Sequence, residues 1–173
     1  MNAETHITEG RFVLLTEEHF DAALAFARDS FTKDEPINRA VGTCWNPVLA
    51  DMWRDTFKCH LTLAVLNETD EVVALRATRV IDKGHHFDVH KIKDPGLKML
   101  FEFISLCDEK AGFFEHYGVE QAFEFFGFGV RNDYGHRGIG GRLFKANLDF
   151  LTYASPDSFC IKGETSSDRK SVV

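Results

Sequence analysis

The chain has 173 residues, the usual size of one domain. Hydrophobic residues make up 44% and charged residues 27%, as in globular proteins, and 13 Gly with 4 Pro are too few for a collagen-like or low-complexity chain. The formal net charge is −7, from 20 basic and 27 acidic residues, and there is no long basic run. We therefore expect no nucleic-acid partner, because phosphate binding needs clustered Lys and Arg.

The four cysteines, Cys44, Cys59, Cys107 and Cys160, are too far apart for CxxC or paired metal-ligand spacing. The N-terminal residues lack the basic and apolar regions of a signal peptide. No apolar stretch approaches the roughly 20 residues that a membrane span needs. We therefore expect a cytoplasmic protein with free thiols, no metal and no membrane partner.

The first half of the chain alternates strand and helix patterns. Residues 7–15 carry the apolar residues of a strand, and Thr16 follows as a helix N-cap. Apolar residues then recur at helical spacing, and Pro36 disfavours helical geometry at Glu35, so this helix ends before the proline. A turn at residues 67–70 joins two later strands as a hairpin. The predicted strands are 7–15, 61–66 and 72–80, and the predicted helices are 17–31 and 46–58.

The second half begins with a polar, irregular segment that is typical of a long loop. A broad apolar face then predicts a helix, and a phenylalanine-dense run interrupted by two glycines predicts a central strand. No linker, repeat or low-complexity stretch divides the chain, so we expect one α/β domain over residues 1–173. The predicted elements here are a loop at 83–96, helices at 97–117 and 138–152, and strands at 121–130 and 159–163.

The junction after the central strand is rich in glycine, with Gly138, Gly140 and Gly141 at the start of a helix. Glycine lets the backbone approach a ligand closely, and the first amides of a helix lack internal partners, so this helix start suits a pyrophosphate. The pattern is neither a dinucleotide-binding GxGxxG with its acidic partner nor a P-loop. On spacing alone, a glycine-rich turn before an ordinary helix remains the alternative.

The run from 130 to 143, V-R-N-D-Y-G-H-R-G-I-G-G-R-L, resembles motif A of the GNAT-type N-acetyltransferases, a strand followed by an Arg/Gln-x-x-Gly-x-Gly/Ala loop that opens a helix. The resemblance implies an α/β fold with a mixed central sheet flanked by helices, and acetyl-CoA as the acyl-donor substrate. Gly135 replaces the Arg/Gln of that loop, which we expect to weaken donor affinity without abolishing it. The resemblance implies pyrophosphate contacts from the backbone of His136, Arg137, Gly138, Ile139, Gly140 and Gly141, and pantetheine contacts from Phe128, Gly129 and Val130.

A second segment, F-T-K-D-E-P-I-N at residues 31–38, is similar to the Asp-Glu-Pro-Leu/Ile-Asn segment of invertebrate arylalkylamine N-acetyltransferases. In that group the glutamate before proline is the general base, often acting through water, and this role maps onto Glu35. The chemistry is reasonable, because an ammonium substrate must lose a proton before it attacks a thioester and a carboxylate can accept it. For Asp34 and Glu35 taken alone, a solvated acidic helix end is the competing interpretation.

The resemblance covers nearly the whole chain, but enzymes of this group continue through another helix and two strands after the fifth strand. The sequence ends at Val173, so we expect a fold that is incomplete at its C-terminus and lacks the tyrosine that serves as general acid in the family. Some relatives use serines in this region, and Ser167 and Ser171 are the candidate catalytic counterparts. A polar tail without a catalytic role is the competing interpretation.

Two further groups of residues have more ordinary interpretations. His85, His86 and His90 lack a compact ligand set, so we interpret their segment as a polar loop without a metal. The phenylalanines of the central strand are expected to fill the core on both faces of the sheet. Phe126 and Phe128 share a parity, which places them on the same face and makes either one a candidate to line the cleft.

Together the patterns predict transfer of an acetyl group from acetyl-CoA to a small-molecule primary amine, with an arylalkylamine as the expected acceptor. Two alternatives stay open: a catalytically impaired CoA-binding isoform, and a polyamine or lysine acetyltransferase with the same donor site. The net charge of −7 is compatible with a cationic acceptor in each case and does not separate them.

Overall fold

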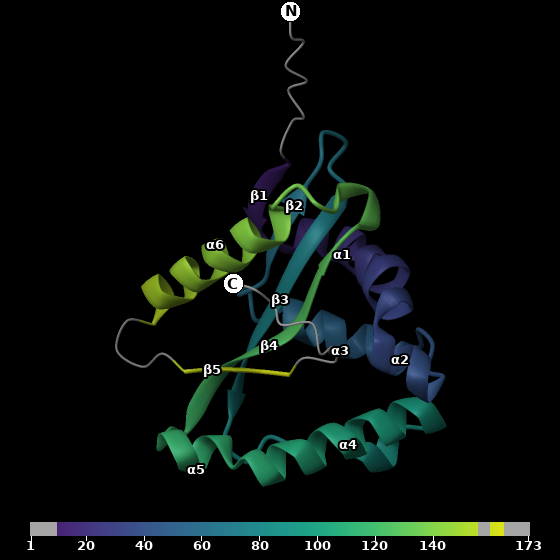
Figure 1. Cartoon of the computed structure of the whole chain (residues 1–173), viewed down its shortest axis with the longest axis vertical. Helices are drawn as coiled ribbons and strands as arrows, with labels where there is room; N and C mark the ends of the chain where they lie inside the picture. Colours follow the sequence, from purple (N-terminus) through teal and green to yellow (C-terminus); the bar gives the residue numbers. More distant parts are fainter. Residues whose placement is uncertain (1–9, 156–159, 165–173) are drawn as a thin grey trace, which may run out of the picture.

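Five strands form one mixed sheet in the computed structural model, which describes residues 10–155 and 160–164 (Figure 1). The strands lie in the order β1-β2-β3-β4-β5, and each neighbouring pair is antiparallel except β4 and β5, which run parallel. The mixed sheet expected from the sequence is therefore confirmed. The strands are β1 (Arg11–Leu14), β2 (Leu63–Leu66), β3 (Val72–Asp82), β4 (Gln121–Val130) and β5 (Ile161–Gly163).

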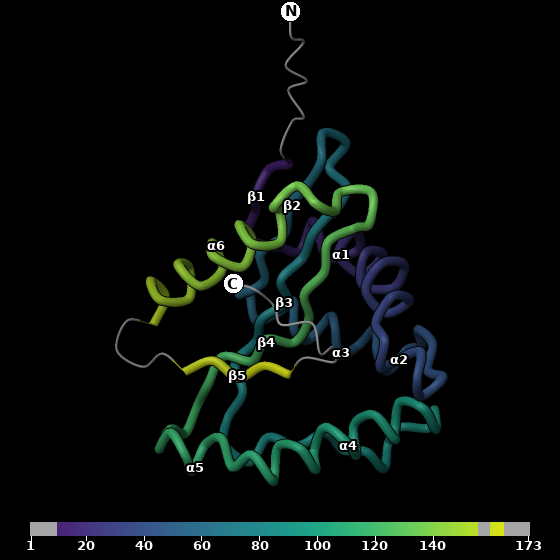
Figure 2. Tube along the Cα trace, viewed as in Figure 1, coloured from purple at the N-terminus to yellow at the C-terminus, as the bar shows by residue number. Residues whose placement is uncertain are grey.

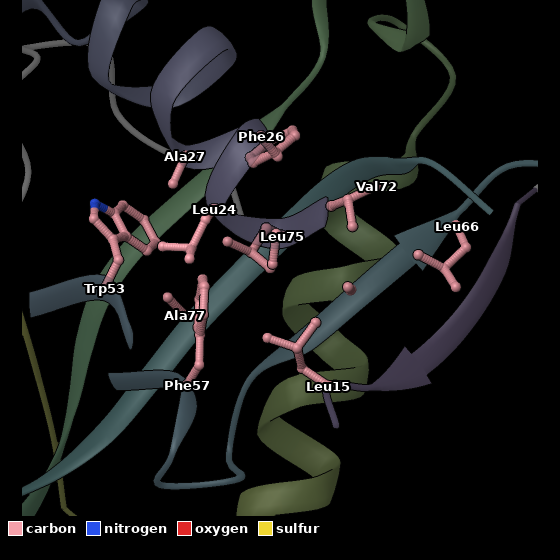
Figure 3. Packing of buried hydrophobic residues seen from close by; sticks show 12 residues of the cluster. Leu15, Leu24, Phe26, Ala27, Trp53, Phe57, Leu66, Val72, Leu75 and Ala77 are labelled. Carbon is pink, nitrogen blue, oxygen red and sulfur yellow. The ribbon is translucent and has the colours of Figure 1, made fainter. Parts of the chain in front are cut away.

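Helices cover both faces of the sheet. Helices α1 and α3 pack on one face and α6 on the other, so that Figure 3 shows α1 in front of the strands and α6 behind them. Helix α4 follows β3 and meets α2 at its N-terminal end, as the tube in Figure 2 shows. The helices are α1 (Phe20–Phe26), α2 (Pro36–Val41), α3 (Pro47–Phe57), α4 (Pro95–Ala111), α5 (Phe113–Tyr117) and α6 (Ile139–Ala154).

The larger core cluster forms between α1, α3 and the sheet. Trp53 and Phe57 of α3 are almost fully buried, with ring centroids 5.8 Å apart, and belong to one cluster with Leu75 and Ala77 of β3 (Figure 3). Burying each such aromatic ring stabilises the fold by about 1.5–3 kcal/mol. Because strand residues alternate between faces, Arg76 lies on the opposite face, which α6 covers.

A β-bulge in β4 places Phe126 and Phe128 on opposite faces, so the expected shared face is wrong. The pairing with β3 skips Phe126, since Phe125 and Gly127 face consecutive residues of β3. The Phe126 ring packs edge-on against Trp53 of α3, at 5.0 Å between centroids, whereas the Phe128 ring lies 6.4 Å from a phenylalanine ring of α6. One unpaired residue reverses the face of every residue beyond it, and the sequence parity does not record that residue.

The helix expected over 97–117 is wrong as a single element. Helix α4 ends at Gly112, which has a left-handed conformation (φ 54°, ψ 39°), and the short helix α5 follows it. A helix cannot continue through this conformation, and glycine adopts it without a Cβ clash. The start of α4 is capped by the Asp94 carboxylate, which accepts a hydrogen bond from the Leu97 amide at 2.7 Å.

The helix expected over 17–31 is present, but it ends in a π-helical turn over Ala27–Thr32. Glu35 is then extended (φ −65°, ψ 117°), as the following proline requires, and α2 begins at Pro36. The sequence did not predict α2. The buried Asn38 amide of α2 donates to the carbonyl of the last π-turn residue at 3.3 Å. Glu35 is therefore held at a corner between two helical segments.

The other predicted elements are confirmed to within about two residues at each end, where assignments ordinarily differ. Residues 7–9 of the first predicted strand and Phe159 of the last lie outside the described residues. All four cysteines are free thiols. In the described part of the chain, no helix has both the length and the apolar character to cross a membrane.

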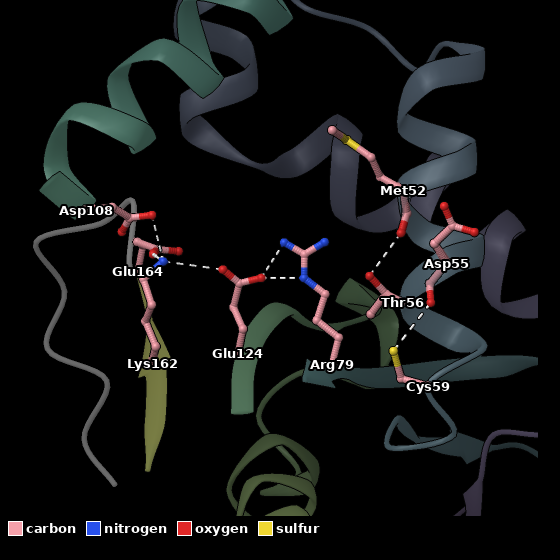
Figure 4. Close-up of polar contacts among 9 residues, drawn as sticks. All are labelled: Met52, Asp55, Thr56, Cys59, Arg79, Asp108, Glu124, Lys162 and Glu164. Atoms are coloured by element: carbon pink, nitrogen blue, oxygen red, sulfur yellow. Dashed lines mark hydrogen bonds and ion pairs between the residues drawn. The ribbon is translucent and has the colours of Figure 1, made fainter. Parts of the chain in front are cut away.

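A buried chain of charges joins β3, β4 and β5 (Figure 4). Arg79 of β3 pairs with Glu124 of β4, and their side chains are only 11% and 7% exposed, so each desolvated charge depends on the other. Lys162 of β5 lies 3.4 Å from Glu124 and 2.8 Å from Asp108 of α4. Burial by itself lowers the pKa of Lys162, but hydrogen bonds to Asp108 and Glu164 outweigh it and raise that pKa above its ordinary value. Charge pairing thus holds the short strand β5 against β4.

Gly127→Ala is expected to lower the free energy of unfolding by about 1–3 kcal/mol, the usual effect of overpacking a core. A Cβ at Gly127 would lie 2.4 Å from the Cη2 atom of the buried Trp53. Gly141→Ala is the matched control, because nothing lies within 4 Å of a Cβ there and alanine favours a helix by roughly 0.5–1 kcal/mol over glycine. Urea unfolding of both variants measures the difference. Equal stability of Gly127→Ala and the parent would contradict the packing.

Lys162→Met is expected to lower the free energy of unfolding at pH 7 by about 1–3 kcal/mol, because three carboxylates lose their shared cation. The folded-state pKa of Lys162 is raised above the ordinary 10.5, so its stabilising contribution is complete below that pH and is lost as pH rises through the folded pKa. Urea unfolding should therefore give equal deficits at pH 7 and pH 9 and a smaller deficit above pH 10.5.

The matched control is Lys145→Met. Lys145 pairs with Asp149 at 2.7 Å on the surface of α6, and their side chains are 75% and 66% exposed. Removing such an exposed pair changes stability by less than about 1 kcal/mol. A control deficit as large as that of Lys162→Met, or a Lys162→Met deficit that widens at high pH, would contradict the role assigned to Lys162.

Candidate functional site

The turn between β4 and α6 contains a 3-10 turn and two residues with positive φ. The Arg131 amide donates to the Val73 carbonyl of β3 at 2.8 Å, and a 3-10 turn over Asn132–Tyr134 follows directly. His136 and Gly138 then both have positive φ, at 60° and 71°. This left-handed conformation suits glycine and strains a residue with a Cβ, by roughly 1–2 kcal/mol. The strained His136 therefore marks a turn that the surrounding structure holds in place.

Helix α6 begins without a side-chain cap in the described part of the chain, so no side-chain cap satisfies its first amides. Gly138 is the N-cap residue, and the first bond within the helix runs from the Arg142 amide to the Gly138 carbonyl at 3.2 Å. The amides of Ile139, Gly140 and Gly141 precede that bond and have no partner inside the helix. They lie at the positive end of a 16-residue helix, which favours an anion such as a pyrophosphate.

Gly140 brings the start of α6 close to the end of β4. A Cβ at Gly140 would lie 3.2 Å from the Phe128 ring and 3.4 Å from a Val130 methyl group, closer than most side chains tolerate. Ile139 is 4% exposed and holds the same helical turn in the core. A Cβ at Gly141, in contrast, would meet nothing within 4 Å. Gly140 is therefore required by packing, whereas Gly141 leaves open space beside the free amides.

Two arginines stack on Tyr134 beside this turn. The guanidinium carbons of Arg131 and Arg137 lie 4.8 Å and 5.0 Å from the centroid of the Tyr134 ring. Arg131 forms an ion pair with Asp133 at 2.8 Å, and the hydrogen bond in that pair raises the pKa of Arg131. Arg137 donates to the Asp133 carbonyl at 3.0 Å. The turn thus combines helix amides without intrahelical partners with the guanidinium of Arg137, which suits the phosphates of the expected donor.

Gly135 stands where the family motif has Arg or Gln. A Cβ at Gly135 would lie 3.1 Å from the Asn132 carbonyl oxygen, so a larger residue would press on the 3-10 turn. Arg137 keeps a positive charge near the turn that Gly135 cannot supply, whereas the charge of Arg131 is balanced by Asp133 and Glu71. The departure from the motif at Gly135 is therefore compatible with an anion site.

Beyond Phe125, the outer edge of β4 pairs with no strand among the described residues. Strand β5 pairs with three residues of β4 that end at Phe125, and Figure 1 shows the two strands diverging from there. The backbone groups of this outer edge are open to an extended ligand, as in other peptide-like recognition at a sheet edge. Phe128, Gly129 and Val130, the expected pantetheine contacts, belong to this edge, and the Phe128 side chain is 38% exposed.

The segment that carries Glu35 lies against the same end of β4. The Asn132 amide group donates to the Asp34 carboxylate at 3.1 Å, across 98 residues of sequence. A Phe31 ring carbon lies 3.7 Å from the position of a Cβ on Gly129. Glu35 is half-buried, and its backbone N–H donates to the Phe31 carbonyl at 2.9 Å. The structure therefore brings the candidate base segment and the candidate donor edge together, a proximity that neither motif states by itself.

A second buried carboxylate of β4, Glu124, is unsuited to the role of base. Both of its oxygens are engaged, one by Arg79 and the other by Lys162 (Figure 4). A proton arriving at Glu124 would leave the buried Arg79 without its carboxylate partner, which is costly. Glu124 therefore stabilises the sheet, and Glu35 remains the candidate base.

Arg76 of β3 is a residue that the sequence analysis missed. It is 7% exposed, and its Nε atom is buried without a hydrogen-bond partner in the described part of the chain. Burial lowers the pKa of Arg76 to about 9, which still leaves the guanidinium charged at neutral pH. The sequence signal that could have identified Arg76 is an arginine inside an apolar strand pattern, V-V-A-L-R-A-T-R-V over residues 72–80.

Ser167 and Ser171 lie outside the described residues, so their catalytic roles stay predictions. The histidine-rich loop contains a 3-10 turn over Val89–Lys91, and the His85 ring packs against a phenylalanine with centroids 5.5 Å apart. Within residues 10–155 and 160–164, no group of three or more His, Cys, Asp or Glu side chains could hold a metal ion.

Solved structures with similar architecture include insect N-acetyltransferases. Arylalkylamine N-acetyltransferase 2 from Aedes aegypti has 18% sequence identity and a TM-score of 0.80, over 89% of this chain and 74% of that chain. A mosquito arylalkylamine N-acetyltransferase like 5b has 12% identity and a TM-score of 0.82, over 91% and 77%. The Drosophila melanogaster polyamine N-acetyltransferase, described as forming N-acetylagmatine, has 13% identity and a TM-score of 0.77, over 91% and 76%.

No family model and no curated protein matches the sequence. The likeness therefore rests on structure, at identities where backbone arrangement persists although most side chains differ. The mixed sheet and the flanking helices agree with the resemblance drawn from the two sequence motifs. The chain has the fold of the GNAT-type N-acetyltransferases.

Proposed function

We propose that the chain is an acetyl-CoA-dependent N-acetyltransferase of a small primary amine, with an arylalkylamine as the acceptor. The observation that carries the proposal is the 3.1 Å hydrogen bond between Asn132 and Asp34, which holds the segment of Glu35 beside the end of β4. Direct acyl transfer needs a bound donor and a base that faces the acceptor nitrogen. We propose that residues 1–173 form one domain that contains both the donor site and the base.

The donor is held by backbone groups on two elements. The free amides at the start of α6, from Ile139 to Gly141, receive the pyrophosphate, and Arg137 adds positive charge. The open edge of β4 over residues 126–130 receives the amides of the pantetheine arm as a strand would. With the pyrophosphate at α6 and the pantetheine arm along β4, the thioester of the donor lies near the bulge at Phe126.

Glu35 supplies the proton-transfer step. Its carboxylate takes a proton from the ammonium form of the acceptor, directly or through one water, and releases a neutral amine. The amine nitrogen attacks the thioester carbonyl, a C–N bond forms, and the C–S bond breaks with its electron pair on sulfur. The nitrogen then loses its second proton, which the thiolate takes up to leave as the thiol, and becomes an amide nitrogen. The protein contributes position and a base, and no covalent enzyme intermediate is required.

Aromatic side chains near the base segment support an aromatic acceptor. The rings of Phe31 and Phe126 each meet Trp53 edge-on, at 5.2 Å and 5.0 Å between centroids. Trp53 is buried, but Phe31 and Phe126 are half-buried and keep ring surface that an arylalkyl group can contact. Mosquito enzymes of the same fold are named for arylalkylamines, whereas the Drosophila enzyme is described as a polyamine N-acetyltransferase, so a polyamine acceptor is the second candidate.

Gly140→Asp is expected to weaken CoA binding by about 100-fold or more, equivalent to about 2.7 kcal/mol. The substitution adds a negative charge beside the amides that receive the pyrophosphate and a Cβ 3.2 Å from the Phe128 ring. Gly140→Ala is the matched control, since it adds the Cβ without the charge, and it should lose less than about tenfold. Titration calorimetry with CoA measures both. Unchanged affinity in Gly140→Asp would remove the basis for the donor site.

Glu35→Gln is expected to lower turnover roughly 10²–10⁴-fold at neutral pH, because glutamine keeps the shape but accepts no proton. Affinity for CoA should be retained. Asp51→Asn is the control, since Asp51 is an exposed carboxylate of α3 paired with Arg54 at 3.2 Å. Release of the CoA thiol, followed with a chromogenic disulfide, gives the rates. Equal turnover of Glu35→Gln and the parent would move the base elsewhere.

The same assay tests the acceptor class. The panel contains dopamine, serotonin and tyramine as arylalkylamines, spermidine as a polyamine, and a lysine peptide. Fastest turnover is expected with the arylalkylamines. A preference for spermidine would favour the second candidate, and CoA binding without turnover of any amine would indicate a binding protein instead of an enzyme.

A further inference from the structure

Arg76 is a buried cation whose charge no carboxylate balances within the described residues. It lies on β3 opposite Phe128 of β4, on the face that α6 covers. Its neighbour on the same face, Thr78, donates to the Asn147 side chain of α6 at 3.1 Å. Arg79 of the same strand, in contrast, has a buried carboxylate partner in Glu124. Two arginines of one strand therefore differ in whether the protein itself compensates them.

Aromatic rings surround the Arg76 guanidinium. Its central carbon lies 3.5 Å from the centroid of the Phe125 ring and 5.3 Å and 5.4 Å from those of Phe128 and Phe144. These contacts are favourable, but they leave the Nε hydrogen without an acceptor. Burial is the cause of the lowered pKa of Arg76, and no charged neighbour contributes to it. A desolvated cation of this kind destabilises an empty protein and is suited to an incoming anion.

The position of Arg76 coincides with the point where β5 leaves β4. Phe125, on which the guanidinium stacks, is the last residue of β4 that pairs with β5, opposite Gly163. A Cβ on Gly163 would lie 3.3 Å from the Phe125 Cβ, so β5 packs directly against this residue. Arg76 therefore reaches from β3 across the α6 face of β4, and its guanidinium lies over Phe125, at the closed end of the open β4 edge.

The length of the proposed donor matches this placement. From Val130, beside the helix start, back to Phe125 is five residues of strand, about 17 Å at about 3.3 Å per residue. The pantetheine arm is a chain of about 14 bonds, the length of about five residues at three backbone bonds each. A donor with its pyrophosphate at α6 and its arm along β4 therefore brings its sulfur to Phe125 and Arg76.

We propose that Arg76 binds the sulfur of the donor and stabilises the thiolate that leaves during acyl transfer. The inference rests on the proposed function, since it needs a thioester donor on this edge. As the C–S bond breaks, its electron pair stays on sulfur, and the guanidinium pairs with the resulting anion in a site with little water. The thiolate later takes the proton that the amide nitrogen released, and CoA leaves as the thiol. Arg76 is thus a catalytic residue that contacts a reacting atom.

The test compares binding of CoA and desulfo-CoA, which lacks the thiol, between pH 6 and pH 9. A free thiol has a pKa of about 8.5, and a cation at the sulfur lowers the pKa of bound CoA. Affinity for CoA relative to desulfo-CoA should therefore rise with pH up to about 8.5, where Arg76, with its pKa of about 9, is still mostly charged. A lowering of the bound pKa by one unit gives a rise of about tenfold. Titration calorimetry measures both ligands without any turnover.

The variant Arg76→Met keeps the length and removes the charge, so the ratio of affinities should become independent of pH. Its melting temperature should equal or exceed that of the parent, because an unbalanced buried charge is replaced by an apolar chain. Arg76→Lys should retain part of the pH dependence and covers the case in which the methionine variant does not fold. Thr78→Val, which removes a buried hydroxyl two residues along the same face, is the matched control and should retain the full dependence.

Each outcome decides the proposal. A parent protein that binds both ligands with a constant ratio overturns the role of Arg76 and leaves the acetyltransferase proposal standing. If the ratio of CoA to desulfo-CoA affinity depends on pH equally in Arg76→Met, the proposal is also overturned. The contacts of Arg76 with the Phe125 ring are then packing contacts only. A parent that binds neither ligand overturns the donor site and the inference together. A ratio that rises in the parent and in Thr78→Val, but not in Arg76→Met, establishes the contact.

Discussion

Strand β4 is hydrogen-bonded on both edges as far as Phe125 and, within the described residues, on one edge beyond it. An open strand edge inside a protein leaves backbone N–H and C=O groups that need partners. The proposed donor supplies those partners, and the helix start of α6 and the Glu35 segment both lie at the same open end. The interruption of one strand pair is therefore the constraint on which the proposed donor site, the candidate base and the proposed role of Arg76 all depend.

The charges of the sheet fall into two physically different classes. Arg79, Glu124 and Lys162 compensate one another, so they stabilise the closed part of the β4–β5 pair and leave nothing for a ligand. Arg76 lies three residues before Arg79, on the other face, where aromatic rings contact the charge without neutralising it. Balanced charges hold the fold together, while an unbalanced one lowers its stability and is available for binding.

Local signals in the sequence were reliable where one or two residues decide the backbone. Pro36 predicted the extended Glu35, and the glycines predicted the turn into α6, because both effects act within a few bonds. The prediction of a single helix over 97–117 was wrong because Gly112 takes a left-handed conformation. The apolar face continues on both sides of Gly112, so the hydrophobic pattern does not indicate this break. The parity of the β4 phenylalanines was wrong for a related reason, since pairing with β3 decides where a bulge lies.

The sequence by itself indicated an α/β domain and a helix start suited to an anion, because helix caps, proline and glycine geometry are properties of short segments. The mixed sheet and the candidate base followed from the family resemblance. Only the tertiary structure decided that Asp34 meets Asn132, that β5 stops at Phe125, and that Arg76 is buried without a counterion. These are facts about neighbours far apart in the chain. Burial and charge compensation depend on which elements pack together, and no periodicity within a single segment records that arrangement.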